Sequence, residues 1–336
     1  MRSHRLAGAA IVAAGLLATT SAFALPALTV TQFDAPGADP GSTQFTGIAP
    51  TTGAVVGTFT TNNGTVTDAF IKNGNNLTIL NNQPGFSALG ASQAVTPFGI
   101  NDAGIVSGDF VLNSNTNAGF IANNGVFKVF NQPGATESFP GGINNTGVVA
   151  GQFIDNTVNH LSHAFTENQN GSGFTQIDVP GATGSSGFNV NNHGDVVGEA
   201  FFSTGAGQRG FLLHNGAFTT IDHSTFFTLA AAINDAGLIV GNFEDSSNKL
   251  HGFFDDNGAF SQFDALPGTT ETLIAGIDNN GDIVGTFRDA NRVQHAFEGL
   301  VPQVIVTAAP EPATLTLLAG GLLALGLVRR RKAASA

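Results

Sequence analysis

A short segment occurs six times in this chain, and this repetition constrains the fold more than any other feature. The clearest copy reads Ala-Ile-Asn-Asp-Ala-Gly-Leu-Ile-Val-Gly-Asn-Phe at residues 232–243. Related segments lie at residues 47–59, 99–110, 142–153, 189–200 and 276–287. A period of roughly 40 to 50 residues is typical of repeat architectures, in which each unit is a small group of secondary structure elements.

Each period contains sequence for four short strands. The copy that begins near Leu250 predicts strands over residues 251–254, 259–264, 272–277 and 282–287. Asn257-Gly258 separates the first two strands and suits the positive φ angles of a tight hairpin. Pro267-Gly268 interrupts the chain before the third strand. Four strands of about five or six residues with their turns fill one period, as in one blade of a β-propeller.

Two residues, a Phe and a Gly, recur at the same repeat position in all six copies. The first strand carries Phe at 70, 120, 165, 211, 253 and 297, and the fourth carries Gly at 57, 108, 151, 198, 241 and 285. The fourth strands are apolar on both faces, as buried strands between neighbouring sheets must be. We expect the fourth-strand Gly to let neighbouring backbones approach closely.

The two ends of the repeat region complement each other. It begins with a second strand at residues 30–37 and ends with a first strand at residues 294–297. Joined, they complete one shared blade beside five intact ones, and a closed ring has no open sheet edge. The sequence therefore predicts an all-β, six-bladed β-propeller over residues 29–306, closed by shared N- and C-terminal strands. An open solenoid or two smaller sheets is the alternative.

Residues 1–24 have the features of a secretory signal peptide. Arg2 and Arg5 precede an apolar run at residues 6–17, and small residues end at Ala22-Phe23-Ala24. This pattern predicts cleavage by signal peptidase after Ala24, with the A-x-A site formed by Ala22 and Ala24. The alternative is an uncleaved N-terminal anchor. In both cases the protein is exported across the inner membrane.

The composition changes abruptly after Val306. Residues 307–312 form a linker with the triplet Pro310, Glu311 and Pro312, and residues 313–328 are apolar or small. This run predicts a transmembrane helix, although it is short for a full span. The basic tail, residues 329–336, contains Arg329, Arg330 and Arg331 and is expected in the cytoplasm by the positive-inside rule.

The triplet, the apolar span and the arginines together resemble the PEP-CTERM sorting signal. The resemblance implies recognition by an exosortase-type transpeptidase, removal of the tail near the triplet, and a final location at the cell surface or in the extracellular matrix. Proteins with this signal occur in bacteria that make exopolysaccharide and biofilm. The membrane is then contacted only through the C-terminal helix before processing. A plain C-terminal membrane anchor is the alternative.

The repeats resemble the bacterial extracellular family named for its His-Ala-Phe triplet. That triplet stands at residues 163–165 and 295–297, with His-Gly-Phe at 251–253 as a variant. Asp68, Ala118 and Arg209 stand where the other copies would have His. The resemblance implies a repeat fold and a surface location, and it supplies no catalytic residues.

Composition excludes several classes of protein. The chain has no Cys, so it forms no disulfides and no thiolate metal sites. Residues 25–309 contain 23 Asp and Glu against 6 Lys and Arg, a net charge of −17. Binding of nucleic acid or anionic lipid needs Lys and Arg contacts to phosphate, so we expect no nucleic-acid partner.

Candidate chemistry is sparse. His163, His251 and His295 share one repeat position, but we expect no carboxylate to recur beside them and predict half-buried His bonding a neighbouring strand. The Asn- and Asp-rich turns, such as residues 234–237 and 278–282, suit hairpins better than calcium loops. We therefore predict no catalytic residues, no metal and no cofactor, with weak calcium binding as an alternative. The acidic residues Glu244, Asp245, Asp255, Asp256 and Glu271 are the candidates for a glycosidase pair, and we expect most to be solvated.

These observations predict an exported, surface-sorted structural or interaction module without enzymatic activity. The expected partners after export are extracellular polysaccharide of a biofilm matrix or other surface proteins. Two alternatives remain: a carbohydrate-active lyase or hydrolase on the propeller scaffold, and a calcium-dependent adhesin.

Overall fold

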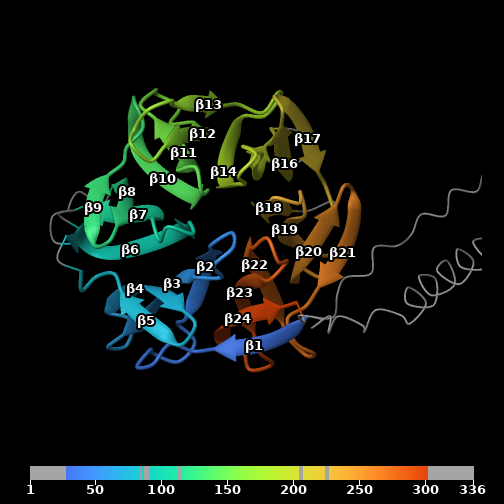
Figure 1. Cartoon of the computed structure of the whole chain (residues 1–336). Helices are drawn as coiled ribbons and strands as arrows, with labels where there is room; N and C mark the ends of the chain where they lie inside the picture. Colours follow the sequence, from blue (N-terminus) through green and yellow to red (C-terminus); the bar gives the residue numbers. More distant parts are fainter. Residues whose placement is uncertain are drawn as a thin grey trace, which may run out of the picture. The chain divides into compact units, whose positions relative to one another are not determined.

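A computed structural model describes residues 28–83, 85–86, 91–112, 116–203, 207–223 and 227–301. The predicted signal peptide, linker, transmembrane segment and basic tail lie outside these residues. In the described part, 24 strands form six four-stranded antiparallel sheets arranged as blades around a central axis (Figure 1). Among these residues, no helix has the length and apolar character needed to cross a membrane. The predicted six-bladed β-propeller is confirmed.

Each blade consists of four strands, which follow one another from the axis outward. Blade 1 is β2 (Gln44–Ile48), β3 (Val55–Thr61), β4 (Val66–Asn73) and β5 (Asn76–Ile79). Blade 2 is β6 (Ala91–Ile100), β7 (Val106–Leu112), β8 (Asn117–Asn123) and β9 (Val126–Val129). Blade 3 is β10 (Ala135–Ile143), β11 (Val148–Asp155), β12 (Ser162–Asn168) and β13 (Thr175–Ile177).

The remaining three blades follow the same order. Blade 4 is β14 (Gly184–Val190), β15 (Val196–Phe201), β16 (Gln208–His214) and β17 (Ala217–Ile221). Blade 5 is β18 (Thr228–Ile233), β19 (Ile239–Glu244), β20 (Leu250–Asp256) and β21 (Ala259–Phe263). Blade 6 is β22 (Glu271–Ile277), β23 (Ile283–Arg288), β24 (Gln294–Leu300) and β1 (Thr29–Phe33).

Blade 6 closes the ring with strands from both ends of the chain. β1 pairs antiparallel with β24, from Thr29 opposite Leu300 to Phe33 opposite Ala296. The two strands lie side by side although more than 260 residues separate them in sequence (Figure 1). The predicted closure by shared terminal strands is therefore confirmed.

The sequence repeat and the structural blade are out of phase. In the copy near Leu250, β20 and β21 are the outer strands of blade 5, whereas β22 and β23 are the inner strands of blade 6. The assignment of all four strands of a copy to one blade is wrong. The tight Asn257-Gly258 hairpin keeps its two strands in one sheet, with Asn257 at φ 51° and Gly258 at φ 90°. The longer connection through Pro267-Gly268 carries the chain to the next blade.

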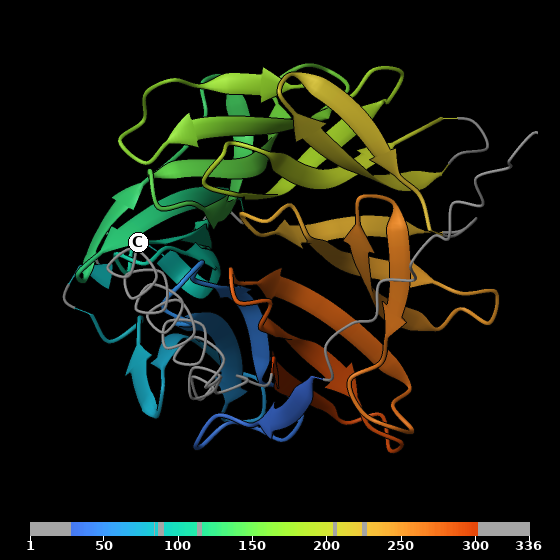
Figure 2. The ribbon, with the colours of Figure 1, turned by 45° about the vertical axis from the view of Figure 1, so that its right-hand side comes forward.

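The hydrophobic core lies between the blades. Six clusters of buried side chains each combine residues from two neighbouring blades. Each blade contributes a third-strand Phe that is at most 1 % exposed, namely Phe70, Phe120, Phe165, Phe211, Phe253 and Phe297. Figure 2 shows the twisted sheets packed against one another around the axis. Because each cluster contains residues from two neighbouring blades, closure of the ring completes the core between blades 6 and 1 as well as the sheet of blade 6.

The axial channel as candidate functional site

The six innermost strands share one irregularity. Each has a β-bulge at the same repeat position, where the register with the second strand shifts. A bulge leaves a residue unpaired and re-aims its side chain. The residues left unpaired at this position are Thr46, Phe98, Gly141, Phe188, Ala231 and Ala275, and in blade 3 the adjacent Gly142 is unpaired as well. All six line a cavity on the ring axis.

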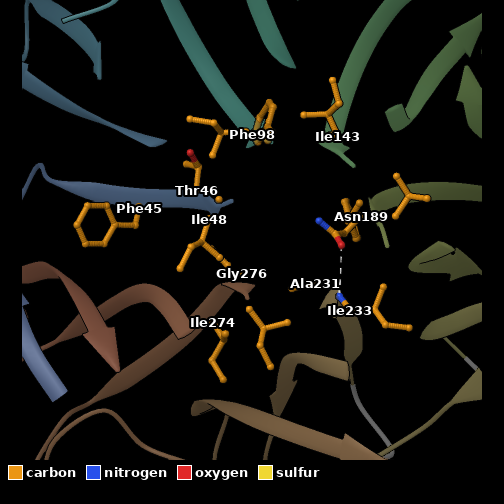
Figure 3. A pocket seen from close by; sticks show the side chains of 18 of the residues that line it. Phe45, Thr46, Ile48, Phe98, Ile143, Asn189, Ala231, Ile233, Ile274 and Gly276 are labelled. Atoms are coloured by element: carbon orange, nitrogen blue, oxygen red, sulfur yellow. Dashed lines mark hydrogen bonds between the residues drawn. The ribbon is translucent and has the colours of Figure 1, made fainter. Parts of the chain in front are cut away.

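This cavity, the axial channel, has a volume of about 370 Å³. Beside the bulged residues lies a collar of branched aliphatic side chains, one from each blade: Ile48, Ile100, Ile143, Val190, Ile233 and Ile277. Figure 3 shows members of both sets surrounding the axis. A preformed, mainly apolar cavity of this size with a few polar groups is typical of a ligand site.

The bulged residues make the channel asymmetric. Blades 2 and 4 present Phe98 and Phe188, while blade 3 between them presents Gly141. Phe98 is 36 % exposed, in contrast to the buried third-strand Phe residues. Within the described part of the chain, neither ring contacts another aromatic ring. The channel therefore has an aromatic side interrupted by glycine, opposite a side with the small residues Ala231 and Ala275.

Apart from Asp235, the polar side chains of the channel are neutral amides and hydroxyls. The Asn189 side chain projects toward the axis, and its Oδ1 accepts a 3.4 Å hydrogen bond from the backbone N–H of Ile233 (Figure 3). Thr46, Gln44, Gln152 and Asn242 also line the channel. Among the described lining residues there is no Lys or Arg, and Asp235 is the only ionisable one.

The Asn- and Asp-rich turns form a closed ring of hydrogen bonds at one end of the channel. In each turn the backbone N–H of one residue donates to the side chain or carbonyl of the next blade. The series runs from Asp102 to Asn145 (2.9 Å), Asn145 to Asn192 (2.8 Å), Asn192 to Asp235 (2.8 Å), Asp235 to Asn279 (2.9 Å), and Asn279 to the carbonyl of Pro50 (2.7 Å). Thr51 completes the circle by donating to Asp102 at 2.8 Å. We call this set the polar ring.

Two carboxylates anchor the polar ring. Partial burial acts to raise the pKa of Asp235, but donation from the Asn192 backbone and side chain and from the Asn279 amide lowers it overall. Asp102 behaves likewise: burial opposes ionisation, yet the N–H groups of Thr52 and Thr51 and the Asn145 amide lower its pKa. Both groups are therefore ionised and engaged at neutral pH. The sequence predicted these turns but not their role in joining blades.

The three repeat-equivalent His residues each lie between two carboxylates. His251 Nδ1 is 2.7 Å from Asp264 Oδ1, and His251 Nε2 is 3.3 Å from Asp245 Oδ2. His163 is placed in the same way between Asp178 (2.6 Å) and Asp155 (3.4 Å), and His295 between Asp34 (3.0 Å) and Asp289 (4.0 Å). The expectation that no carboxylate recurs beside these His residues is wrong.

A signal in the sequence could have found these clusters. In the three blades that carry His, the Asp near Nε2 of the His stands four residues after the repeated Gly, as Asp245 follows Gly241. At that position blades 1, 2 and 4 have Thr61, Leu112 and Phe202. The His251 ring also stacks on Phe243, with ring centroids 5.3 Å apart. Among the described residues, no group of three or more His, Asp or Glu is placed to hold a metal ion.

The candidate glycosidase carboxylates are dispersed. Asp245 belongs to the His251 cluster, Glu271 pairs with Arg288 at 2.9 Å, and Asp255 accepts a hydrogen bond from the Gly258 N–H. Asp256 accepts one from the Asn257 side chain. Glu244 borders an open hollow between blades 4 and 5 that also contains Phe202, Gln208 and Asn248.

Asp109 is a buried carboxyl that was not singled out from the sequence. Burial between blades 2 and 3 raises the pKa of Asp109 to about 7; its own backbone N–H opposes the shift and the nearby Glu137 adds to it. Asp109 does not belong to the lining of the axial channel.

Residues 308–332 match the PEP-CTERM protein-sorting motif. This match confirms that resemblance and covers the predicted sorting residues Pro310, Glu311, Pro312, Arg329, Arg330 and Arg331, which lie outside the described residues, as do Ala22 and Ala24. The motif implies export, a surface or extracellular location, and recognition by an exosortase-type processing enzyme. The chain matches no curated protein sequence.

Several solved propellers are similar in fold. AofleA from Arthrobotrys oligospora has a TM-score of 0.50 and 12 % identity, over 82 % of this chain and 89 % of that one. A six-bladed fucose-recognising lectin from Aleuria aurantia has a TM-score of 0.47 and 12 % identity, over 82 % and 100 %. A neuraminidase-like protein of a bat influenza virus, subtype N11, has a TM-score of 0.46 and 9 % identity, over 82 % and 94 %. At such identities the likeness concerns the fold alone.

Proposed function

We propose that this protein is a non-enzymatic binding module of the cell surface, which holds extracellular matrix polysaccharide in its axial channel. On this proposal the signal peptide of residues 1–24 is removed on export. The C-terminal segment, residues 313–328, spans the membrane until an exosortase-type enzyme cuts near Pro310-Glu311-Pro312. On the same proposal, the ectodomain belongs to the bacterial extracellular His-Ala-Phe repeat family.

The observation that carries this proposal is the set of bulged residues facing the axis. Each of the six innermost strands uses one residue to line the channel instead of extending the ladder. Two of these residues are Phe98 and Phe188, whose rings lie in a cavity rather than in the core between blades. Aromatic faces with nearby amides and hydroxyls suit the apolar and polar faces of a sugar ring.

The sorting motif supports a binding role at the surface. The last strand, β24, ends at Leu300, and the matched motif begins at residue 308. Removal of the tail near the triplet therefore takes no strand of the ring, and the released ectodomain retains its channel.

The test uses a variant in which the channel is filled. Ala275→Phe places an aromatic ring at the repeat position that already holds Phe98 in blade 2 and Phe188 in blade 4, so the bulge accommodates the new side chain. Calorimetric titration of the exported protein with the extracellular polysaccharide of its own cells should show binding for the wild type and at least tenfold weaker binding for Ala275→Phe.

The exposed substitution Val126→Ala is the control, since Val126 is 69 % exposed on the outermost strand of blade 2. Equal melting temperatures would show that both variants are folded. Unchanged affinity of the folded Ala275→Phe variant, or no binding by the wild type, would contradict the proposal.

A further inference from the structure

The geometry points to an uncharged sugar ring as the group that the axial channel recognises, held between Phe98 and Phe188 and selected against sugars that carry a carboxylate. This inference rests on the proposed function and specifies its ligand class.

The first argument is the arrangement of the two Phe side chains. Blade 3 lies between blades 2 and 4 and places Gly141 at the level where its neighbours place Phe98 and Phe188. A side chain at 141 would meet the Phe188 carbonyl oxygen at 2.5 Å, so the backbone packing there excludes any larger residue. Because Gly141 adds no side chain of its own, blade 3 leaves a gap in the channel lining between the two aromatic residues. A pyranose ring, with C–H groups on its faces and hydroxyls at its edge, has the shape and polarity to enter this gap.

The second argument is the set of hydrogen-bonding groups that line the channel. Asn189 follows Phe188 directly, and its amide nitrogen has no hydrogen-bond partner in the described structure, while its Oδ1 makes only the 3.4 Å contact to Ile233. Gln44 also lines the channel and makes no side-chain hydrogen bond within the described residues. Neutral amides can donate to and accept from hydroxyl groups, and they do not compensate an anionic charge.

The third argument is charge. No Lys or Arg is among the described lining residues, and the ionisable residue present is Asp235, held as a carboxylate in the polar ring. Residues 25–309 carry a net charge of −17. A uronic acid would lose its hydration in the channel without gaining a counter-charge, and it would be repelled by the surrounding acidic surface. A channel lining of this kind thus selects against the charged competitor.

The experiment compares two forms of one ligand. Oligosaccharides from the extracellular polysaccharide of the same cells are freed of acidic fragments by anion exchange, and half of the neutral pool is oxidised at its primary hydroxyls to carboxylates. The exported protein is titrated with both pools. We expect the neutral pool to bind and the oxidised pool to bind at least tenfold more weakly.

Variants locate the site. Phe98→Ala and Phe188→Ala should each weaken binding of the neutral pool about tenfold, the effect of losing one aromatic contact. Phe202→Ala is the matched control, because Phe202 is a partly exposed aromatic in the hollow between blades 4 and 5. Ala275→Lys should raise affinity for the oxidised pool, since it adds a cation opposite the two Phe rings.

The outcomes separate this inference from the proposed function. Equal binding of both pools, abolished by Ala275→Phe, would leave the proposed function standing and overturn the inference. Loss of binding in Phe202→Ala but not in the two channel variants would place the ligand in the hollow and overturn both. No binding of the neutral pool by the wild type, with binding of the oxidised pool, would also overturn the inference.

Discussion

Gly241 on β19 lies directly opposite Phe253 on β20, and the Phe253 ring covers the space that a side chain at 241 would need. A Cβ at this position would be 2.6 Å from Phe253 Cζ, and the carbonyl oxygen of Leu229 on β18 would be nearer still. The same Gly–Phe pair faces across the second and third strands of every blade. The glycine thus makes room both for the ring and for the neighbouring strand.

Gly241→Val should destabilise the propeller strongly, because neither the backbone oxygen nor the fully buried ring can move aside. We expect a loss of about 3 kcal/mol or more, seen as a fall in melting temperature of roughly 6 °C or more. Ala259→Val introduces the same side chain at an exposed position of the same blade and should change little. An unchanged melting temperature for Gly241→Val would refute the role assigned to this glycine.

Asp235→Ala should weaken the polar ring. The carboxylate accepts hydrogen bonds from the Asn192 N–H, the Asn192 side chain and the Asn279 side chain, and their loss leaves these donors unpaired. We expect a cost of about 2 to 3 kcal/mol in denaturant unfolding. Asp256→Ala removes a carboxylate with one local contact and should cost less than about 0.5 kcal/mol. Equal effects of the two variants would show that the ring contributes nothing specific.

Asp109→Asn should change how stability depends on pH. The folded-state pKa of about 7 lies above the ordinary value of 3.8, so the protonated form is favoured in the folded protein. The stability linked to this proton is fully present below about pH 4 and is lost as pH rises through 7. The Asp109→Asn variant should therefore be more stable than the wild type by up to about 4 kcal/mol at pH 8, and the two proteins should be almost equally stable at pH 4. A difference independent of pH between 4 and 8 would contradict this assignment.

His295→Ala should loosen the closure of the ring. His295 on β24 contacts Asp34 at 3.0 Å and Gln32 at 2.9 Å, both in or directly after β1, and so links the two ends of the chain. Hydrogen exchange should show faster exchange of amides at residues 29–33. The matched control is His163→Ala, which removes the equivalent cluster inside blade 3. If both variants leave residues 29–33 equally protected, the His295 cluster plays no part in closure.

The architecture was accessible from the sequence because the propeller repeats its signals six times. The Asn257-Gly258 turn, the phase of Phe253 and Gly241, and the strand fragments at the two ends together predict strand number, order and closure. The blade boundaries were predicted wrongly because a repeat has no intrinsic start. In the sequence, the hairpins within a blade and the connections between blades both appear as turns. Only the pairing of strands distinguishes the two kinds of connection.

The channel could not be predicted in the same way. In the sequence, Phe98 and Phe188 resemble any other strand residue, and a bulge that turns them toward the axis depends on pairing between strands rather than on local sequence. The partners of His251 lie six residues before it and 13 after it, so the cluster forms only once β19, β20 and β21 are aligned. By contrast, the sorting motif at residues 308–332 is a linear signal and was found from sequence directly.

The most direct test of the account is the intact mass of the protein recovered from membrane, surface and medium fractions of its own cells. We predict a surface or released form that begins at Leu25 and ends near Pro312, so that it keeps β1 and β24 and hence the closed ring with its channel. A membrane-bound form that retains residues 313–336 as its stable end state would contradict surface sorting by tail removal.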